Sequence, residues 1–404
     1  MSDVLDTELL GKLHSYANQV YDKEIALLKT LAAIPSPTGH EEQRANFIAN
    51  WLRDRGACQV FVDDQRNVVC LLEARDVPAA EDGAKRDVRV FAAHTDIVFV
   101  DTDPLPEHQE GQRLYAPGVG DDTANLVALL AACHFLLTHP AAYDQATRDA
   151  DLLIVANTCE EGLGNLAGTK TLFGELRKAG RKVRSFHSFD LYIPQVISRA
   201  VGSERWKISV SCQGGHSYQN FGRPNAIEVL CRIIERLYAL PLPKDPADGA
   251  HTTRNVGTIK GGTTVNAIAD HASASFEYRS ESAENLATMQ SALKKVITDA
   301  QSELGNKGKV ELEVIGLRPG NGHQDRARLQ RLTDHAAQLV QAVTGEGPDL
   351  SPASTDANIP LSLGIPAVTI GAIRGSLLHT RNEWVDLPSL VDGLTIVLGL
   401  MLEV

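Results

Sequence analysis

Two adjacent glutamates, Glu160 and Glu161, follow the apolar run DLLIVA, which predicts a buried strand. Because strand side chains alternate between two faces, neighbouring carboxylates at a strand end are expected to point in different directions and to do different work. Two negative charges side by side also repel each other unless a cation lies nearby or one carboxyl is protonated. The pair therefore indicates a site with positive charge close by.

Histidine and carboxylates recur where other predicted strands and loops end. His94 and Asp96 lie two apart in FAAHTDIV, and hence on one face of an otherwise buried strand. Asp121 and Asp122 stand at the mouth of a predicted helix after two glycines. Two further residues share this kind of position, Asp190 in SFHSFD and His379 in LLHTRNEW. Ligands bind at strand ends of α/β sheets, and imidazole with carboxylates but no thiolate suits zinc, manganese or cobalt.

Each of these features also has a simpler explanation. A lone histidine such as His94 is more often a hydrogen-bonded core residue than a metal ligand. Paired aspartates before a helix commonly cap it, and paired glutamates are usually solvated. Three other histidines have no position that requires a role, namely His108, His187 and His323. The chain carries H-x-D, G-x-G-D-D and E-E-x-x-G in this order, followed by His379. Taken together, these motifs favour a shared metal site.

Predicted helices and strands alternate along the first half of the chain. Helical periodicity covers 8–34 and 41–56, and strands and helices then alternate to the strand that carries Asp190. A polar stretch at 75–87 is predicted to be an exposed loop. The alternation predicts an α/β fold with a mostly parallel sheet and helices on both faces.

A different order of elements begins near residue 205. Strand, helix, strand, strand, helix and strand follow one another, which is the βαββαβ order of ferredoxin-like domains. Helix and strand alternation then returns and ends in a helix from about residue 388. We therefore predict a catalytic domain formed by 1–203 and 318–404, with a second domain, 204–317, inserted into it.

Composition narrows the class of protein. The 404 residues are 43% apolar, enough for a large core, and the net charge of −12 argues against a nucleic-acid surface. The acidic N-terminus lacks the basic segment of a signal peptide, and no apolar run approaches 18 residues, which argues against a membrane partner. The six cysteines form no C-x-x-C pair and are expected to be reduced. These features predict a cytoplasmic protein.

Together the motifs resemble the dinuclear zinc peptidases and amidohydrolases that include peptidase T, carboxypeptidase G and succinyl-diaminopimelate desuccinylase. The resemblance extends over nearly the whole chain and includes GGHS, GGTTVNAIAD and FEYR in the inserted domain. The C-terminal STDANIPLSLGIPAVTIG, followed by HTRNEWVDL, is most similar to the peptidase T branch. The resemblance implies a zinc-exopeptidase-like fold with a lid domain. It also implies two divalent metal ions per chain, zinc above all, with cobalt or manganese as alternatives.

The resemblance implies a ligand set for each metal. One metal would be bound by His94, Asp121 and Asp190. The other would be bound by Asp121, Glu161 and His379, so that Asp121 bridges the two.

It also implies the residues that act beside the metals. Asp96 would hold the far nitrogen of His94 and so fix its ring. Glu160 would take a proton from water, which divalent metals make more acidic, and return it to the leaving amine. Two positions depart from the family pattern: Thr123 replaces the usual lysine, and Asp190 lies in an unusual SFDLY context.

The inserted domain is expected to contact the substrate. The resemblance assigns substrate binding to Asn266 and Arg279, on two adjacent predicted strands, and oxyanion stabilisation to His216, which in relatives sometimes serves the neighbouring subunit. The planar fork of Arg279 suits a carboxylate, although a surface ion pair with Glu277 or Glu281 is the alternative. We expect a homodimer formed through the lid.

Three functions compete at this point. The first is a dinuclear metallo-exopeptidase for short peptides, and the second is an amidase for N-acyl or N-carbamoyl amino acids with the same chemistry at the metals. The third is a non-catalytic protein that binds a metal or a peptide on this scaffold. Glu160 argues against the third, because a binding protein has no use for a base.

Overall fold

The computed structural model describes residues 5–75, 85–101, 103–244 and 252–404. Most of the loop predicted at 75–87 therefore lies outside the described residues. The chain divides into two compact units, one formed by Met1–Arg199 with His323–Val404 and the other by Ala200–Gly322. The second unit begins and ends a few residues outside the boundaries that the sequence suggested, 204 and 317.

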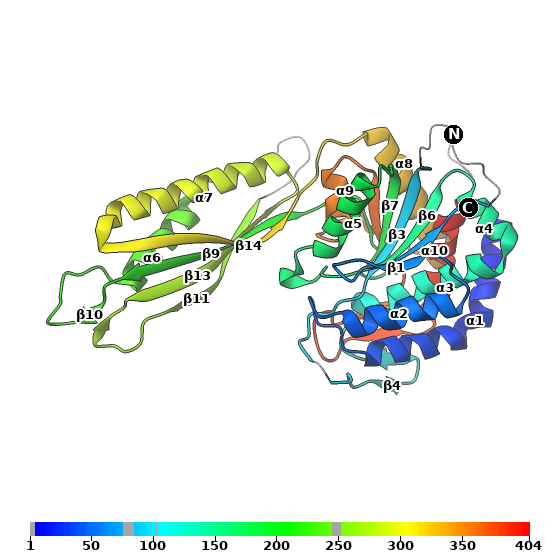
Figure 1. Cartoon of the computed structure of the whole chain (residues 1–404), viewed down its shortest axis with the longest axis horizontal. Helices are drawn as coiled ribbons and strands as arrows, with labels where there is room; N and C mark the ends of the chain where they lie inside the picture. The colour runs from blue at the N-terminus through cyan, green and yellow to red at the C-terminus, as the bar shows by residue number, and fades with distance from the viewer. Residues whose placement is uncertain (1–4, 76–84, 102, 245–251) are drawn as a thin grey trace. The chain divides into compact units, whose positions relative to one another are not determined.

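The first unit contains a seven-stranded mixed sheet (Figure 1). In order across the sheet, its strands are β1 (Val60–Val62), β2 (Val68–Leu72), β6 (Asp151–Asn157), β3 (Val88–His94), β7 (Val183–Phe189), β15 (Ala367–Ile370) and β8 (Val196–Ile197). The four strands β6, β3, β7 and β15 run parallel, whereas β1, β2 and β8 pair antiparallel with their neighbours. The predicted α/β fold is confirmed, but the sheet is parallel only at its centre. The short connection 63–67 between β1 and β2 leaves room only for an antiparallel hairpin.

Helices cover both faces of this sheet. One face shares a single apolar cluster with α1 (Thr7–Ala33), α2 (Glu42–Asp54), α3 (Ala124–Thr138), α4 (Pro140–Thr147), α8 (Arg326–Thr344) and α10 (Ser389–Leu402). The opposite face carries α5 (Ala167–Lys178) and α9 (Asn358–Ser362) (Figure 1). Phe173 of α5 packs on Phe186 of β7, with ring centroids 5.7 Å apart. Phe189 lies three residues after Phe186, so its side chain points to the other face of the sheet, where it belongs to the apolar cluster that includes α1 and α10.

A smaller sheet of the first unit places two loops side by side. It consists of β16 (Gly375–Ser376), β17 (Trp384–Asp386), β5 (Arg113–Tyr115) and β4 (His108–Glu110). Trp384 of β17 pairs with Tyr115 of β5. The loop before β17, which carries His379, therefore lies beside the loop that leads into the turn Val119–Thr123 and helix α3.

The second unit follows the βαββαβ order. Its elements are β9 (Gly202–Cys212), α6 (Ala226–Ala239), β11 (Thr253–Gly261), β13 (His271–Ser280), α7 (Ala283–Leu304) and β14 (Gly308–Arg318). The strands form an antiparallel sheet in the order β11-β13-β9-β14, and one apolar cluster joins this sheet to α6 and α7. A separate two-stranded ribbon is formed by β10 (Gly215–His216) and β12 (Ala267–Ile268).

Taken singly, the helices in the described part of the chain are too short or too polar to suggest a membrane span. Among the described helices, one pair, Val119–Thr138 and Pro140–Thr147, has the combined length and apolar composition of a membrane span, but it is bent by 110°. Most of α3, which belongs to this pair, is buried in the core.

Candidate metal centre

Three parallel strands end side by side and bring together polar residues predicted from the sequence. Because β6, β3 and β7 are neighbours in the sheet, their carboxyl ends meet at one edge. His94 is the last residue of β3, and Asp190 directly follows β7. Glu160 and Glu161 come a few residues after β6. All four side chains are buried.

The two glutamates follow a turn and do not continue the strand. Cys159, with φ of 57°, takes the chain out of the extended conformation before Glu160. Strand alternation therefore no longer applies, and the expectation that the two carboxylates point to different faces is wrong. Ligand atoms of His94, Glu160 and Glu161 lie within 4.8 Å of one another, so both carboxylates reach the same cluster.

Asp96 ties His94 to this glutamate pair. Its Oδ1 accepts a hydrogen bond from the backbone N–H of Glu160, and its Oδ2 accepts one from the N–H of Glu161, both at 3.0 Å. Nδ1 of His94 lies 3.1 Å from the backbone oxygen of Asp96 and 3.5 Å from its Oδ1. Burial alone would raise the pKa of Asp96, but the hydrogen bond and charge of His94 lower it. Asp96 thus fixes both the imidazole ring and the backbone that carries the two glutamates.

One carboxylate, that of Asp121, lies between two histidines. Its Oδ1 is 2.9 Å from Nε2 of His94, and its Oδ2 is 3.1 Å from Nε2 of His379. Nε2 of His379 is also 3.2 Å from Oε1 of Glu161. Each oxygen of Asp121 therefore lies close to a different histidine, which is the arrangement expected of a carboxylate that bridges two metals.

Glu383, which was not among the predicted site residues, holds the loop that carries Asp121. Its carboxylate accepts hydrogen bonds from the backbone N–H groups of Gly118, Gly120 and Asp121 at 3.0, 2.8 and 2.7 Å. Burial, followed by the charge of Asp121, raises the pKa of Glu383 to about 7. The signal in the sequence was an acidic residue close to His379 in HTRNEW, but its burial could not be read there.

Three groups of three side chains among the described residues have the geometry of metal sites: His94, Glu160 and Glu161 form one, and two others share Asp121. Of these two, one is His94, Asp121 and Asp190, and the other is Asp121, Glu161 and His379; within each group the ligand atoms lie within 4.8 Å of one another. All are nitrogen or oxygen ligands, which suits zinc, manganese or cobalt.

The electrostatics of the cluster favour cations. Burial and the nearby charge of Asp121 raise the pKa of Glu161 to about 8, and they also raise that of Asp190. Hydrogen bonds to Asp121 and Glu161 raise the pKa of His379 to about 10. The buried carboxylates thus retain protons unless another positive charge replaces them. Two divalent cations fit both the donor set and this charge balance.

Asp356, in the segment STDAN, is a further buried carboxyl to which the sequence alone assigned no role. It accepts hydrogen bonds from the side chains of Asn157 and Thr169. Burial and the charge of Glu160 raise its pKa to about 7. Asp356 therefore lies within electrostatic reach of the predicted base.

The substrate-binding candidates lie in the second unit and do not gather at one place within it. His216 pairs with Ala267 in the ribbon, and Asn266 lies directly before β12, so these two are close together. Arg279 is near the far end of β13, a ten-residue strand that spans roughly 30 Å. Asn266 and Arg279 are therefore not on adjacent strands as expected.

Arg279 already has a partner. Its Nε and Nη2 donate to Oε1 and Oε2 of Glu277 at 2.8 and 3.1 Å, and Arg205 donates to the same carboxylate at 2.8 Å. The alternative ion pair considered from the sequence is present. A substrate carboxylate would have to share or displace Glu277.

Comparison with known proteins identifies the family. The sequence pattern of peptidase family M20/M25/M40 matches residues 90–403. The chain belongs to this family. It is 30% identical to the uncharacterized protein YqjE of Bacillus subtilis over 392 residues, which cover 92% of this chain and 96% of the relative.

Two further comparisons concern proteins with a named activity. A succinyl-diaminopimelate desuccinylase of Corynebacterium glutamicum is 24% identical, over 91% of this chain and 93% of its own. Among solved structures, a tripeptidase from Staphylococcus aureus superposes with a TM-score of 0.71 at 21% identity, covering 94% of this chain and 97% of its own. Membership of this M20 family makes the protein a hydrolytic enzyme, so a non-catalytic binding role is not retained.

Proposed function

We propose that this enzyme is a dinuclear metal-dependent exopeptidase that hydrolyses the amide bond of short peptides. The observation that carries the proposal is the carboxylate of Asp121, which offers one oxygen to the His94 group and the other to the His379 group at 2.9 and 3.1 Å. Glu161 and Asp190 would complete the two ligand sets. Zinc fits this nitrogen and oxygen set best, with cobalt or manganese as alternatives.

The residues around this centre divide the work of hydrolysis. A pair of divalent ions would supply Lewis acidity toward water and toward the amide carbonyl. Glu160 belongs to neither of the two ligand groups that share Asp121, and it would take the proton from the attacking water and return it to the leaving amine. Asp96 would keep Glu160 at a fixed position through its hydrogen bond to the Glu160 N–H.

Arg279 would bind a free carboxylate of the substrate. Its side chain is partly exposed, and its fork already binds Glu277 through two hydrogen bonds, so it has the geometry for a carboxylate. In this proposal Glu277 holds the guanidinium of Arg279 in position. The substrate carboxylate then replaces Glu277 as the acceptor of one of the two hydrogen bonds. The second unit would act as a lid over the substrate.

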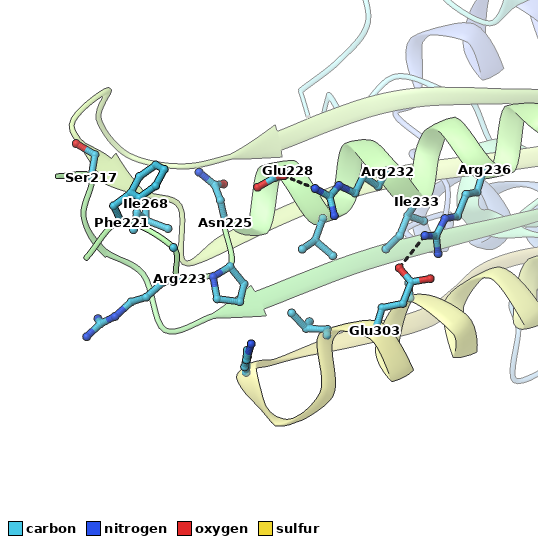
Figure 2. A pocket seen from close by; sticks show the side chains of 16 residues that line it. Ser217, Phe221, Arg223, Asn225, Glu228, Arg232, Ile233, Arg236, Ile268 and Glu303 are labelled. Atoms are coloured by element: carbon cyan, nitrogen blue, oxygen red, sulfur yellow. Dashed lines mark hydrogen bonds and ion pairs between the residues drawn. The ribbon is translucent and has the colours of Figure 1, made fainter. Parts of the chain in front are cut away.

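The opposite end of the second unit would mediate self-association. Three apolar side chains near His216 are strongly exposed, Tyr218 at 87%, Phe221 at 91% and Val265 at 100%. Phe221 also lines a pocket of about 500 Å³ beside α6, where Arg232 and Arg236 are neutralised by ion pairs (Figure 2). We propose that this surface forms a homodimer, with His216 and Asn266 serving the partner subunit's site. Sedimentation of the parent and of Phe221→Ser tests the association; an unchanged monomer in both would exclude it.

A second candidate is an amidase for N-acyl or N-carbamoyl amino acids. It is supported by the 24% identity to a succinyl-diaminopimelate desuccinylase over most of both chains. The metal chemistry would be the same, so substrates must separate the two functions. A panel of di- and tripeptides, N-acyl amino acids and succinyl-diaminopimelate, each with added zinc, manganese or cobalt, does so. The exopeptidase proposal expects the highest kcat/KM on a peptide, and a preference for an acyl amino acid would overturn it in favour of the amidase.

A further inference from the structure

An arginine, Arg44, is completely buried next to the metal centre. Arg44 of α2 has no exposed surface and is the largest fully buried side chain among the residues that the structure describes. Its Nη1 donates to the backbone oxygen of Thr95 at 2.9 Å and lies 3.3 Å from Oγ1 of Thr123. Its Nη2 donates to the backbone oxygen of Ile34 at 2.7 Å. The guanidinium is thus bound mostly to carbonyl groups.

Burial of this charge is costly and lacks the usual compensation. In the described part of the chain no carboxylate forms a direct ion pair with Arg44, and its Nε has no hydrogen-bond partner. The carboxylate of Asp96 is the charge that acts on it from a distance. A buried charge of this kind is usually less stabilising than an apolar side chain of similar volume, so packing alone does not explain an arginine here.

The contacts of Arg44 join the two segments that carry the central ligands. Thr95 lies between His94 and Asp96, and Thr123 lies two residues after Asp121. The hydroxyl of Thr123 in turn donates to the backbone oxygen of Gly118 at 2.6 Å. Arg44 and Thr123 therefore bind oxygen atoms of both segments.

A negative group holds the same loop through its N–H groups. Glu383 accepts from the backbone N–H groups of Gly118, Gly120 and Asp121. Arg44 supplies positive charge to the segments whose carbonyl and hydroxyl oxygens it binds. Glu383 thus binds backbone N–H groups of the Asp121 loop, whereas Arg44 contacts this loop through the hydroxyl of Thr123.

We propose that Arg44 is a positioning residue of the metal centre, whose guanidinium, through Thr95 and Thr123, holds the His94–Asp96 segment and the Asp121 loop at the separation that two metals require. This inference rests on the proposed dinuclear function. Its charge also acts on Asp96, the carboxylate that holds His94. Arg44 touches neither substrate nor metal in this account, and it acts through the two segments that it joins.

The central test removes the charge and keeps the length of the side chain. Arg44→Met should lower the affinity for divalent metal, measured with zinc alone by competition with a chromogenic chelator, by about 10- to 100-fold, the usual loss when a partner behind a metal ligand is removed. With metal at saturation kcat should fall and KM should change little, because substrate contacts remain. Arg53→Met, an exposed position on the same helix, should leave both quantities at the parent value.

A second variant moves the charge to the other side of the contact. Because Oγ1 of Thr123 lies 3.3 Å from the guanidinium, a lysine at position 123 would place its ammonium near the space that Arg44→Met vacates. Thr123→Lys alone should be harmful, because it brings two buried cations together. The double variant Arg44→Met/Thr123→Lys should bind zinc more tightly than either single variant, which packing alone would not produce.

The possible results are distinguishable. If Arg44→Met folds and binds zinc with parent affinity and unchanged kcat, Arg44 is a packing residue and the inference is wrong. If Arg44→Met does not fold, Arg44→Lys, which keeps charge but loses the fork, replaces it, and parent-like zinc affinity and kcat would overturn the positioning role. A double variant no better than Arg44→Met also contradicts the inference. Failure of the parent protein to bind zinc would instead refute the dinuclear centre and the inference with it, whereas zinc binding without peptide cleavage would refute only the exopeptidase proposal.

Discussion

Replacement of Glu160 by glutamine separates catalysis from metal binding. Glu160→Gln keeps the size of the side chain and the backbone N–H that donates to Asp96, but it cannot accept a proton. Glu160 is outside the two ligand groups that share Asp121, and glutamine keeps an oxygen at its place in the third group, with His94 and Glu161, so both metals should remain. Loss of a general base lowers turnover by roughly 10²- to 10⁴-fold, or about 3–5 kcal/mol in activation free energy.

The assay measures kcat on a cleaved dipeptide and metal content of the same sample. Glu161→Gln is the matched control, because it removes an adjacent carboxylate that belongs to a ligand group with Asp121 and His379. The control should lose metal, whereas Glu160→Gln should lose activity only. Parent-like turnover in Glu160→Gln would refute its role as the base. Loss of metal from Glu160→Gln, with metal retained in the control, would show that the two roles are exchanged.

Three further predictions address the loop, the substrate and pH. Glu383→Gln should lower the free energy of unfolding in urea by about 3 kcal/mol, because an amide nitrogen would face backbone N–H donors; an unchanged midpoint would contradict this. Arg279→Ala should erase most of the parent's preference for a free-acid peptide over its C-terminal amide without loss of metal. Equal discrimination by the parent and by Arg279→Ala would make Arg279 structural. Metal binding should release protons at pH 7, because without metal the pKa of Glu161 is raised to about 8 and that of His379 to about 10. Apparent zinc affinity should therefore rise from pH 6 to 8 by about tenfold per pH unit for each proton released, and calorimetry in two buffers that shows no proton release would refute this explanation.

The strand-end residues were predictable because of a simple geometric rule. Parallel strands end at one edge of their sheet, so polar residues after β3, β6 and β7 had to meet there. His94, Glu161 and Asp190 follow this rule, and the structure brings all three into the cluster. The antiparallel strands at the edges were not predicted, because a strand's apolar pattern does not reveal the direction of its neighbour; the short connection between β1 and β2 was the one signal for an antiparallel pair.

The residues that support the site could not be found in this way. Arg44, Asp356 and Glu383 are charged residues from distant parts of the chain, and their types alone predict exposed positions. Their burial results from tertiary packing of α2, the turn before α9 and the loop before β17. The geometry of Glu160 and Glu161 was misjudged for a local reason, since the left-handed turn at Cys159 breaks the strand pattern.

The most direct test of the account is the number of metal ions per chain. Purified enzyme, loaded with zinc and passed over a desalting column, should hold close to two zinc ions per chain by elemental analysis. Asp121→Asn should hold at most one tightly, because Asp121 belongs to both ligand groups. A parent protein that retains no zinc, with His94, Asp121 and His379 intact, would contradict the account, and so would an Asp121→Asn variant that keeps both ions.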